Sequence, residues 1–209
     1  SNIQLCTAHW YGGNREQSCE NTVKSVKKLL GGIQIDGYYE LNMSEIPKLN
    51  NMVDGVTVTL EDDFSKKYPK MKKGATINLD DEQAYAYVHD RYGVGDEENT
   101  SRMKRQQQYM TGFFKKLQEK VKANPNYANE VFESLQDVST TDITIGKISN
   151  ISNIFASGTD KGIFELAGKS KIGQALGDEI DHMEFYVNKK AMVSTMSELF
   201  GIVEQKNKE

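Results

Sequence analysis

Strand-like and helix-like hydrophobic patterns alternate along the 209-residue chain, and this alternation limits the possible folds more than any other feature. Residues 55–62 place Val56, Val58 and Leu60 on one side of a strand and threonines on the other. Residues 102–122 repeat apolar side chains at helical spacing instead. Neither a proline-rich linker nor an internal repeat interrupts this order. We therefore expect one α/β domain over residues 1–209 with a central mixed β-sheet.

Polar side chains that can cap a helix N-terminus mark where helices begin within this pattern. The candidates are Ser18 or Asn21, Ser44, Asp80 or Asp81, and Thr100 or Ser101. Strands are expected at residues 3–8, 33–42, 55–62 and 183–188, and further helices at 124–139, within 140–156 and after 188. The helix at residues 102–122 is expected to bury an apolar stripe, which consists of Met103, Met110, Phe113, Phe114, Leu117 and Val121.

The charge of the chain limits its partners. It carries 26 basic and 30 acidic residues, a net charge of −4, whereas a general nucleic-acid binder presents a strongly basic face. We therefore expect no nucleic-acid partner, although a few arginines in a cleft can still bind an anion. No apolar run approaches the roughly 18 residues that a membrane helix needs, and no signal peptide is visible. The chain opens inside a strand-like segment without a cap, so we expect that an upstream segment is missing.

Two cysteines, Cys6 and Cys19, lie close together in the sequence. In an exported protein they would form a disulfide that closes a short loop, and in a cytosolic protein they would remain free thiols. The cysteine count leaves both alternatives open. Because the sequence holds no CxxC motif and no Cys/His cluster, a zinc site is not expected.

The stretch HDRYGVGDEENTSRMKRQQQYM, residues 89–110, joins an acidic, glycine-containing turn to a helix. If the helix begins near residue 100, then Arg102, Arg105 and Gln106 share one face near its N-terminus. Backbone N–H groups and the helix dipole already favour an anion there, and guanidinium groups match the oxygens of a phosphate. Arg91, on the other side of the turn, could close a clamp around such an anion.

Other interpretations of the same residues remain open. The arginines could pair with the acidic turn on a solvated surface, and the physical pattern does not separate this from an anion site. Asp96 could supply a ligand to Mg²⁺, which needs few protein carboxylates when phosphates complete its shell, or it could be solvated. His89 could act as an acid or base, although a lone histidine at a helix end is more often structural. The acidic run Leu60–Phe64 is interpreted as a solvated turn, and the Gly12–Gly13 pair after His9 as a simple turn.

Four segments in order carry a resemblance to a known family. YVHDRYGVGDEENTSRMKRQQ is similar to a pattern in which a helix ending in Arg-x-Arg precedes a Gly/Asp-containing turn and an Arg-x-x-Arg-Gln-Gln helix. MVDGVTVTLEDDF, KKGATINLDDEQAYAYV and AHWYGG resemble further segments of the same family. The family is LytR–CpsA–Psr (LCP), the bacterial cell-wall glycopolymer transferases. The resemblance covers most of residues 3–122 and is weaker over residues 123–209 of the same domain.

The resemblance implies an α/β/α sandwich and a phosphotransferase at the extracellular face of the cytoplasmic membrane. Family members move a glycopolymer from a polyprenyl-pyrophosphate carrier to peptidoglycan, with Mg²⁺ at the pyrophosphate. The polyprenyl tail would lie in an apolar tunnel between sheet and helices. Carried over residue by residue, the resemblance assigns catalysis to Arg91, Arg102 and Arg105, substrate binding to these three with His89, Gln106 and Gln107, and metal binding to Asp96.

Two features depart from the family pattern. His89 stands where the family has the first arginine of Arg-x-Arg, and a histidine there can hydrogen-bond a phosphate but is not permanently charged. The family's N-terminal strands, which carry metal-binding aspartates and another arginine, and its membrane anchor precede the segment that matches this chain. We therefore expect half a site and no turnover by this chain alone. The alternative function is a non-catalytic polyprenyl-phosphate-binding or regulatory module of the cell envelope.

Overall fold

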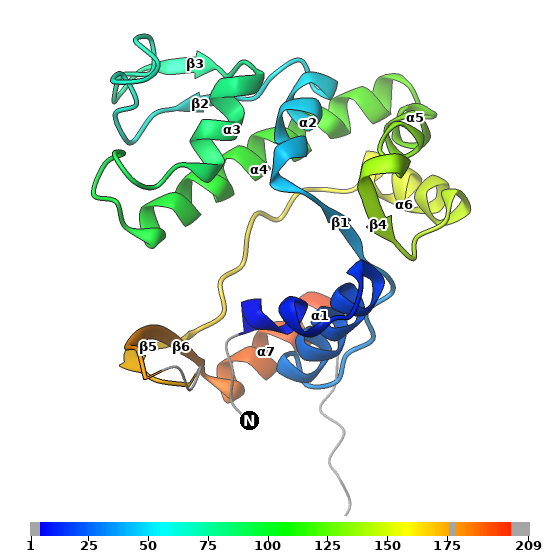
Figure 1. Cartoon of the computed structure of the whole chain (residues 1–209). Coiled ribbons are helices and arrows are strands. Elements are labelled where there is room, and N and C mark those ends of the chain that lie inside the picture. The colour runs from blue at the N-terminus through cyan, green and yellow to red at the C-terminus, as the bar shows by residue number, and fades with distance from the viewer. Residues whose placement is uncertain (1–4, 176–178, 202–209) are drawn as a thin grey trace, which may run out of the picture. The chain divides into compact units, whose positions relative to one another are not determined.

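The computed structural model describes residues 5–175 and 179–201, apart from the side chain of Cys6, and the chain divides into two compact units (Figure 1). The larger unit comprises Leu41–Ser139 and Ile143–Ile163. The smaller unit comprises Ser1–Glu40, Thr140–Asp142 and Phe164–Glu209. The expectation of a single domain over residues 1–209 depends on how these two units are arranged, so it stays a prediction.

The larger unit holds the principal hydrophobic core, which packs α2, α3 and a β-hairpin along the long helix α4 (Figure 1). Its elements are η2 (Met43–Glu45), α2 (Ile46–Met52), β2 (Thr57–Thr59), β3 (Thr76–Asn78), α3 (Asp81–His89), α4 (Asn99–Ala123), α5 (Tyr127–Ser134), η3 (Gln136–Val138) and α6 (Ile145–Ser157). The strands β2 and β3 are antiparallel, with Val58 opposite Ile77. Val58 is buried while Thr57 and Thr59 are exposed, so the predicted alternation of this strand is confirmed.

The two helices that border the charged turn begin at different kinds of cap. Helix α3 follows Asp80, so its predicted start at Asp80 or Asp81 is confirmed. The Asp80 side chain accepts the N–H of Gln83 in a capping box. Helix α4 begins at Asn99 after Glu98, earlier than the cap predicted at Thr100 or Ser101. Its N-cap residue, Glu98, makes no side-chain hydrogen bond to the helix, and the Asp96 carboxylate accepts the backbone N–H of Glu98 just before the first turn.

The buried face of α4 differs from the predicted apolar stripe. Met103, Met110 and Phe114 are 49%, 47% and 44% exposed, so their predicted burial is wrong. The core-facing positions follow a four-residue spacing from Arg105 and Tyr109, which are 2% and 4% exposed. The later members of this row are Phe113 and Leu117, which pack against the core, and Val121, which is buried. An arginine thus occupies a core position at the start of the helix.

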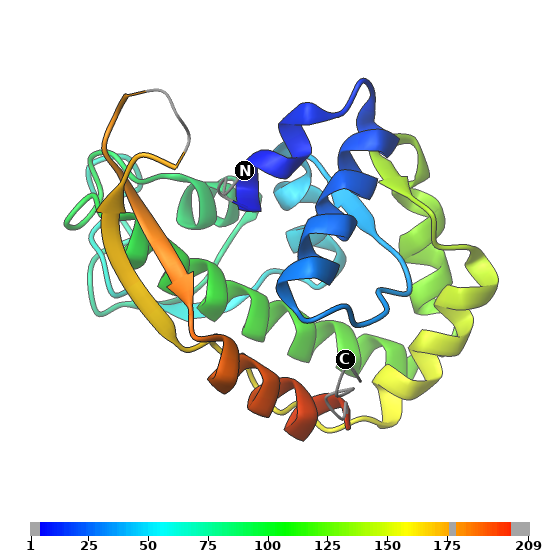
Figure 2. The same cartoon turned by 90° about the horizontal axis from the view of Figure 1, so that it is seen from below.

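The smaller unit is built from two helices, a 3-10 helix and a β-hairpin. Its elements are η1 (Leu5–Tyr11), α1 (Arg15–Leu29), β5 (Gly168–Gly173), β6 (His182–Val187) and α7 (Lys189–Phe200), and the paired strands β1 (Tyr39–Leu41) and β4 (Ser139–Thr141) span the boundary between the units. Helix α1 begins after Asn14, whose side chain accepts the N–H of Gln17 at 2.8 Å. Strands β5 and β6 pair antiparallel along their full length and lead into α7 (Figure 2).

The α/β class is confirmed, but the strands are distributed differently from the expectation. In the described part of the chain they form three two-stranded sheets, β1–β4, β2–β3 and β5–β6, in place of one central mixed sheet. The strand predicted at residues 3–8 is wrong where the structure describes it, because Leu5–Tyr11 forms a 3-10 helix. A strand needs a neighbour to pair its backbone groups, whereas a 3-10 helix pairs them internally.

Two further expectations concern cysteines and membranes. Cys19 is a buried free thiol in this structure, which is the free-thiol alternative of the two left open by the sequence. The side chain of Cys6 lies outside the described residues. Within residues 5–175 and 179–201, none of the helices has both the length and the apolar composition needed to cross a membrane.

Candidate anion-binding site

The turn between α3 and α4, residues 90–98, is fixed by contacts within the chain. Gly93, Gly95 and Glu97 have positive φ angles, and the Glu97 carboxylate accepts the N–H of Gly93 at 2.8 Å. A Cβ atom at Gly95 would lie 2.4 Å from Asp62 Oδ1, so glycine is required for the turn to approach this carboxylate. Val94 is buried in the core. The turn therefore presents its flanking side chains from a defined backbone.

Arg105 lies beneath this turn and is only 2% exposed. Its Nε donates to the Tyr87 carbonyl at 3.0 Å, one Nη donates to the Asp90 carbonyl, and the other forms an ion pair with Asp62. Its Cζ also lies 5.3 Å from the ring centroid of Phe64. Each of the three nitrogens already has a protein acceptor, so Arg105 holds α3, the turn and the segment after β2 together. A guanidinium in this setting is suited to positioning the turn.

The ion pair of Asp62 with Arg105 is a feature that the sequence did not reveal. The acidic run Leu60–Phe64 is predicted to be a solvated turn, and this prediction is wrong for Asp62, whose side chain is 15% exposed. Its partner lies 43 residues further along the chain. No local spacing signals a contact between such distant residues. The approach of Gly95 to the same carboxylate is equally non-local.

Arg91 and Arg102 lie on the two sides of the turn and are both half-buried. The Arg91 guanidinium stacks on Tyr92, with Cζ 4.4 Å from the ring centroid, and donates to its hydroxyl. Arg102 donates to Asn99 Oδ1 at 2.6 Å. In both arginines the Nε–H is buried without a hydrogen-bond acceptor. A buried unsatisfied donor costs roughly 1–3 kcal/mol, and the oxygens of a bound anion would supply the missing acceptors.

The other predicted substrate-binding residues have different surroundings. Gln106 donates to the Val88 carbonyl at 2.9 Å and thereby joins α4 to α3. Gln107, one residue further, is half-buried. The side chain of His89 is 49% exposed, with Nδ1 3.1 Å from Asp90 Oδ1, and its ring stacks on Tyr85 at a centroid distance of 4.7 Å. His89 is therefore held at the surface by protein partners, while Gln106 has a structural contact.

Asp96, the predicted metal ligand, uses both carboxylate oxygens within the chain. One accepts the N–H of Glu98 at 2.9 Å, and the other accepts the Ser101 hydroxyl at 2.8 Å. These two hydrogen bonds lower the pKa of Asp96 below its ordinary value. Among the described residues, no group of three potential ligands includes Asp96. The donors of this turn therefore fit Mg²⁺ only as a single carboxylate, with the remaining ligands supplied by phosphate oxygens and water.

A groove of about 500 Å³ in the larger unit is lined by acidic and amide side chains, in contrast to the arginines of the turn. Its lining is rich in carboxylates and amides, including Asp54, Asp80, Asp81 and Glu82, and it contains none of the predicted arginines. A pyrophosphate would be repelled by such a lining. The anion site is therefore better placed at the turn between α3 and α4 than in this groove.

Comparisons with known proteins agree with this fold. A model of the LytR–CpsA–Psr family matches residues 2–200, whereas no curated protein matches the chain. A structure from Enterococcus faecalis, described as a transcriptional regulator, superposes with a TM-score of 0.73 at 21% identity over 98% of this chain and 72% of its own. TagV of B. subtilis gives 0.67 at 21% identity over 95% and 74%. A structure of TagT bound to LI-WTA gives 0.65 at 19% identity over 93% and 69%.

The structural similarities, at these identities, concern the fold alone. The family match establishes family membership, because it spans almost the whole chain and includes the turn with Arg91 and Arg102. The chain belongs to the LytR–CpsA–Psr family, whose members are cell-wall glycopolymer transferases.

Proposed function

We propose that this protein transfers a glycopolymer from a polyprenyl-pyrophosphate carrier to peptidoglycan at the extracellular face of the cytoplasmic membrane. The observation that supports this most is the pair of buried, unpartnered Nε–H groups of Arg91 and Arg102 on the two sides of one fixed turn. In this proposal the two guanidiniums bind the pyrophosphate and stabilise the charge that develops on it. Arg105 is a positioning residue, because its nitrogens hold the turn.

The exposed apolar side chains of α4 support a lipid-linked substrate. Met103, Met110 and Phe114 recur at helical spacing and are nearly half exposed. The row starts one residue after Arg102, so a pyrophosphate bound at the helix N-terminus would have apolar surface beside it. Burying such side chains against a polyprenyl tail is favourable by roughly 25 cal/mol per Å² of apolar area. The apolar surface of the tail would also be removed from water when it binds.

Mg²⁺ belongs to the proposal as a partner of the pyrophosphate. When bound, it would neutralise phosphate charge and polarise the transferring group. Asp96 is the residue of this turn that would contact it, and its single carboxylate also accepts hydrogen bonds from Glu98 and Ser101. The arginines would retain the pyrophosphate in place, and Gln106 and Gln107 would extend the polar surface along α4.

Thermal unfolding with polyprenyl pyrophosphate and Mg²⁺ tests the proposal. We expect the ligand to raise the unfolding midpoint of the protein, and Arg102→Ala to remove most of that shift. Lys104→Ala is the matched control, because Lys104 is an exposed cation on the same helix turn. Equal loss of the shift in both variants would indicate general charge attraction. No shift in the unmodified protein would contradict the proposal.

His89 favours a second candidate, a module that binds polyprenyl phosphate without catalysis. Its ring is held by Tyr85 and Asp90 and carries no permanent charge. This candidate predicts the same thermal shift but no release of the lipid phosphate in the presence of Mg²⁺ and a peptidoglycan acceptor, even when the N-terminal strands of the family are joined to the chain. Transfer of radiolabelled polymer to peptidoglycan by the protein would exclude it.

A further inference from the structure

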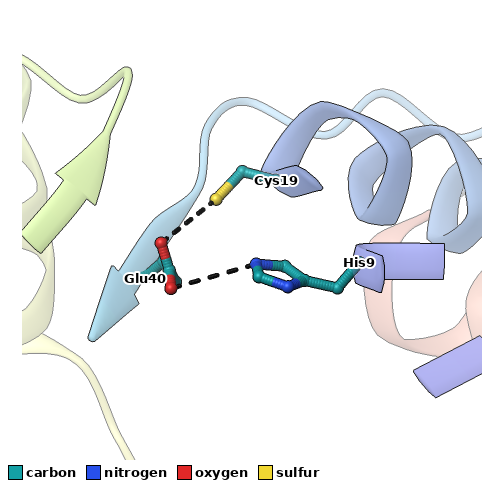
Figure 3. Close-up of side chains that lie close together, drawn as sticks. All are labelled: His9, Cys19 and Glu40. Atoms are coloured by element: carbon teal, nitrogen blue, oxygen red, sulfur yellow. Dashed lines mark hydrogen bonds and ion pairs between the residues drawn. The ribbon is translucent and has the colours of Figure 1, made fainter. Parts of the chain in front are cut away.

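Three segments of the smaller unit bring together His9, Cys19 and Glu40, which lie on η1, α1 and β1 (Figure 3). The ligand atoms of all three lie within 4.8 Å of one another. Cys19 Sγ is 3.7 Å from Glu40 Oε2, and His9 Nε2 is 3.9 Å from Glu40 Oε1. In Figure 3 both side chains point toward the same carboxylate. The three functional groups therefore face one small volume.

These separations are close to those that a tetrahedral zinc ion requires. Zinc binds a thiolate at about 2.3 Å and imidazole nitrogen or carboxylate oxygen at about 2.0–2.2 Å, so neighbouring ligand atoms lie about 3.3–3.6 Å apart. The two contacts to Glu40 exceed this range by a few tenths of an ångström, and they are made to its two different oxygens. With one oxygen taken as the ligand, the three ligand atoms lie within 4.8 Å of one another. Zinc binding would draw these atoms closer together.

The surroundings provide the charge balance and outer contacts that a metal site needs. Cys19 is 4% exposed, so a thiolate there requires a positive partner. A divalent ion with one thiolate and one carboxylate has zero net charge. Arg15 Nε donates to Glu40 Oε2 at 3.1 Å, and the Thr140 side chain also hydrogen-bonds this carboxylate. Such outer contacts orient a ligating carboxylate, and Oε1 remains directed toward His9.

We propose that His9, Cys19 and Glu40 bind a zinc ion, with the fourth position open to water or another ligand. A thiolate among the ligands selects zinc over magnesium. A cysteine nucleophile is a poorer interpretation, because the Cys19 thiol donates to Glu40 and the imidazole contacts the same carboxylate. The proposal departs from the expectation of no zinc site, because its three ligands lie on separate segments and form no Cys/His motif in the sequence. It is independent of the pyrophosphate site.

Cobalt provides the direct test because Co²⁺ accepts zinc ligands and gives a thiolate-to-metal absorption band. We expect one Co²⁺ per chain with this band, displacement by Zn²⁺, and a thermal midpoint that rises by about 5–10 °C when Zn²⁺ is in hundredfold excess over its Kd. Cys19→Ser should remove the band. His9→Gln and Glu40→Gln should each weaken binding by at least about tenfold.

Matched variants separate this site from incidental binding. His182→Gln and Glu20→Gln each remove a residue of the same kind outside the cluster and should leave the titration unchanged. Circular dichroism checks the fold of each variant. If Cys19→Ser fails to fold, the nearly isosteric Glu40→Gln still decides the question. Unchanged Co²⁺ binding by folded Glu40→Gln, weakened binding in His182→Gln or Glu20→Gln, or no stoichiometric binding by the unmodified protein would overturn the proposal.

Discussion

Arg102 and Arg105 lie one turn apart on the same helix, yet the structure gives them opposite surroundings. Arg105 is buried, and each of its nitrogens has an acceptor from α3, the turn or Asp62. Arg102 is half-buried and keeps an Nε–H without an acceptor. The difference shows that a cluster of arginines in a sequence can combine a structural residue with a residue available to a ligand.

The position of each arginine on α4 explains the contrast. Arg105 starts the row that continues through Tyr109 into the core, so its charge is neutralised by Asp62 and by carbonyl groups. Arg102 lies in the first turn of the helix, where its positive charge opposes the helix dipole. A bound anion would reverse that unfavourable interaction. Burial therefore marks the structural arginine, and the unsatisfied donor marks the candidate for binding.

The largest expected effect is that of Arg105→Ala. It leaves Asp62 without its ion pair and two carbonyl groups without a donor, so the free energy of unfolding should fall by about 3–5 kcal/mol. Urea denaturation measures the loss. Arg105→Lys should recover only part of it, because an ammonium cannot reach three separate acceptors as a guanidinium does. A decrease in the free energy of unfolding of less than about 1 kcal/mol in Arg105→Ala would contradict the structural role that separates Arg105 from Arg102.

Arg102→Ala should show the reverse behaviour. We expect its stability to stay within about 0.5 kcal/mol of the unmodified protein, because removing the unpartnered Nε–H offsets the loss of the hydrogen bond to Asn99. Its affinity for inorganic pyrophosphate should fall by about 10- to 100-fold, the loss expected for a charge-assisted hydrogen bond. Isothermal titration at low ionic strength measures this affinity. The pyrophosphate affinity of Arg102→Lys should lie between those of the unmodified protein and Arg102→Ala. An unchanged affinity in Arg102→Ala would contradict the assignment of Arg102 as the binding arginine and Arg105 as the structural one.

Local signals in the sequence predicted much of this region, and the non-local contacts account for what was missed. The helix start at Asp80 and the alternation of β2 depend on residues a few positions apart, and both predictions are confirmed. The pairing of Asp62 with Arg105 depends on tertiary packing, as does the exposure of Met103 and Met110. The three ligands of the zinc proposal are likewise joined only by the fold.

Tyr87, which contacts Arg105, provides a test of the buried region through the pH dependence of protein stability. Its carbonyl accepts from Arg105, its hydroxyl donates to Gln108, and burial raises the pKa of the phenol from 10.0 to about 12. The neutral phenol is thus favoured in the folded state. Its contribution to stability is fully present below pH 10 and is lost as the pH rises toward about 12.

Tyr87→Phe should therefore flatten the decline in stability over this alkaline range, with a loss of about 1 kcal/mol at neutral pH for the missing hydrogen bond. The midpoint of urea unfolding, measured at intervals from pH 7 to about 12, tests the expectation. Tyr11→Phe is the control, because Tyr11 is 68% exposed. An alkaline decline in Tyr87→Phe as steep as that of the unmodified protein would contradict the buried role of this phenol.

The smallest effect is expected at Asp96, which connects the turn to the first residues of α4. Asp96→Asn keeps one side-chain oxygen to accept the N–H of Glu98, so circular dichroism and thermal unfolding should change little. Asp96→Ala removes both contacts and should destabilise the protein more than Asn does. Pyrophosphate titration with and without Mg²⁺ then separates the two roles. If Asp96 only holds Glu98 and Ser101 at the start of α4, Asp96→Asn retains the gain in affinity that Mg²⁺ provides. If Asp96 contacts the ion, Asp96→Asn loses that gain while Arg102 still binds the pyrophosphate, and the turn is shown to hold a metal ligand beside its two available arginines.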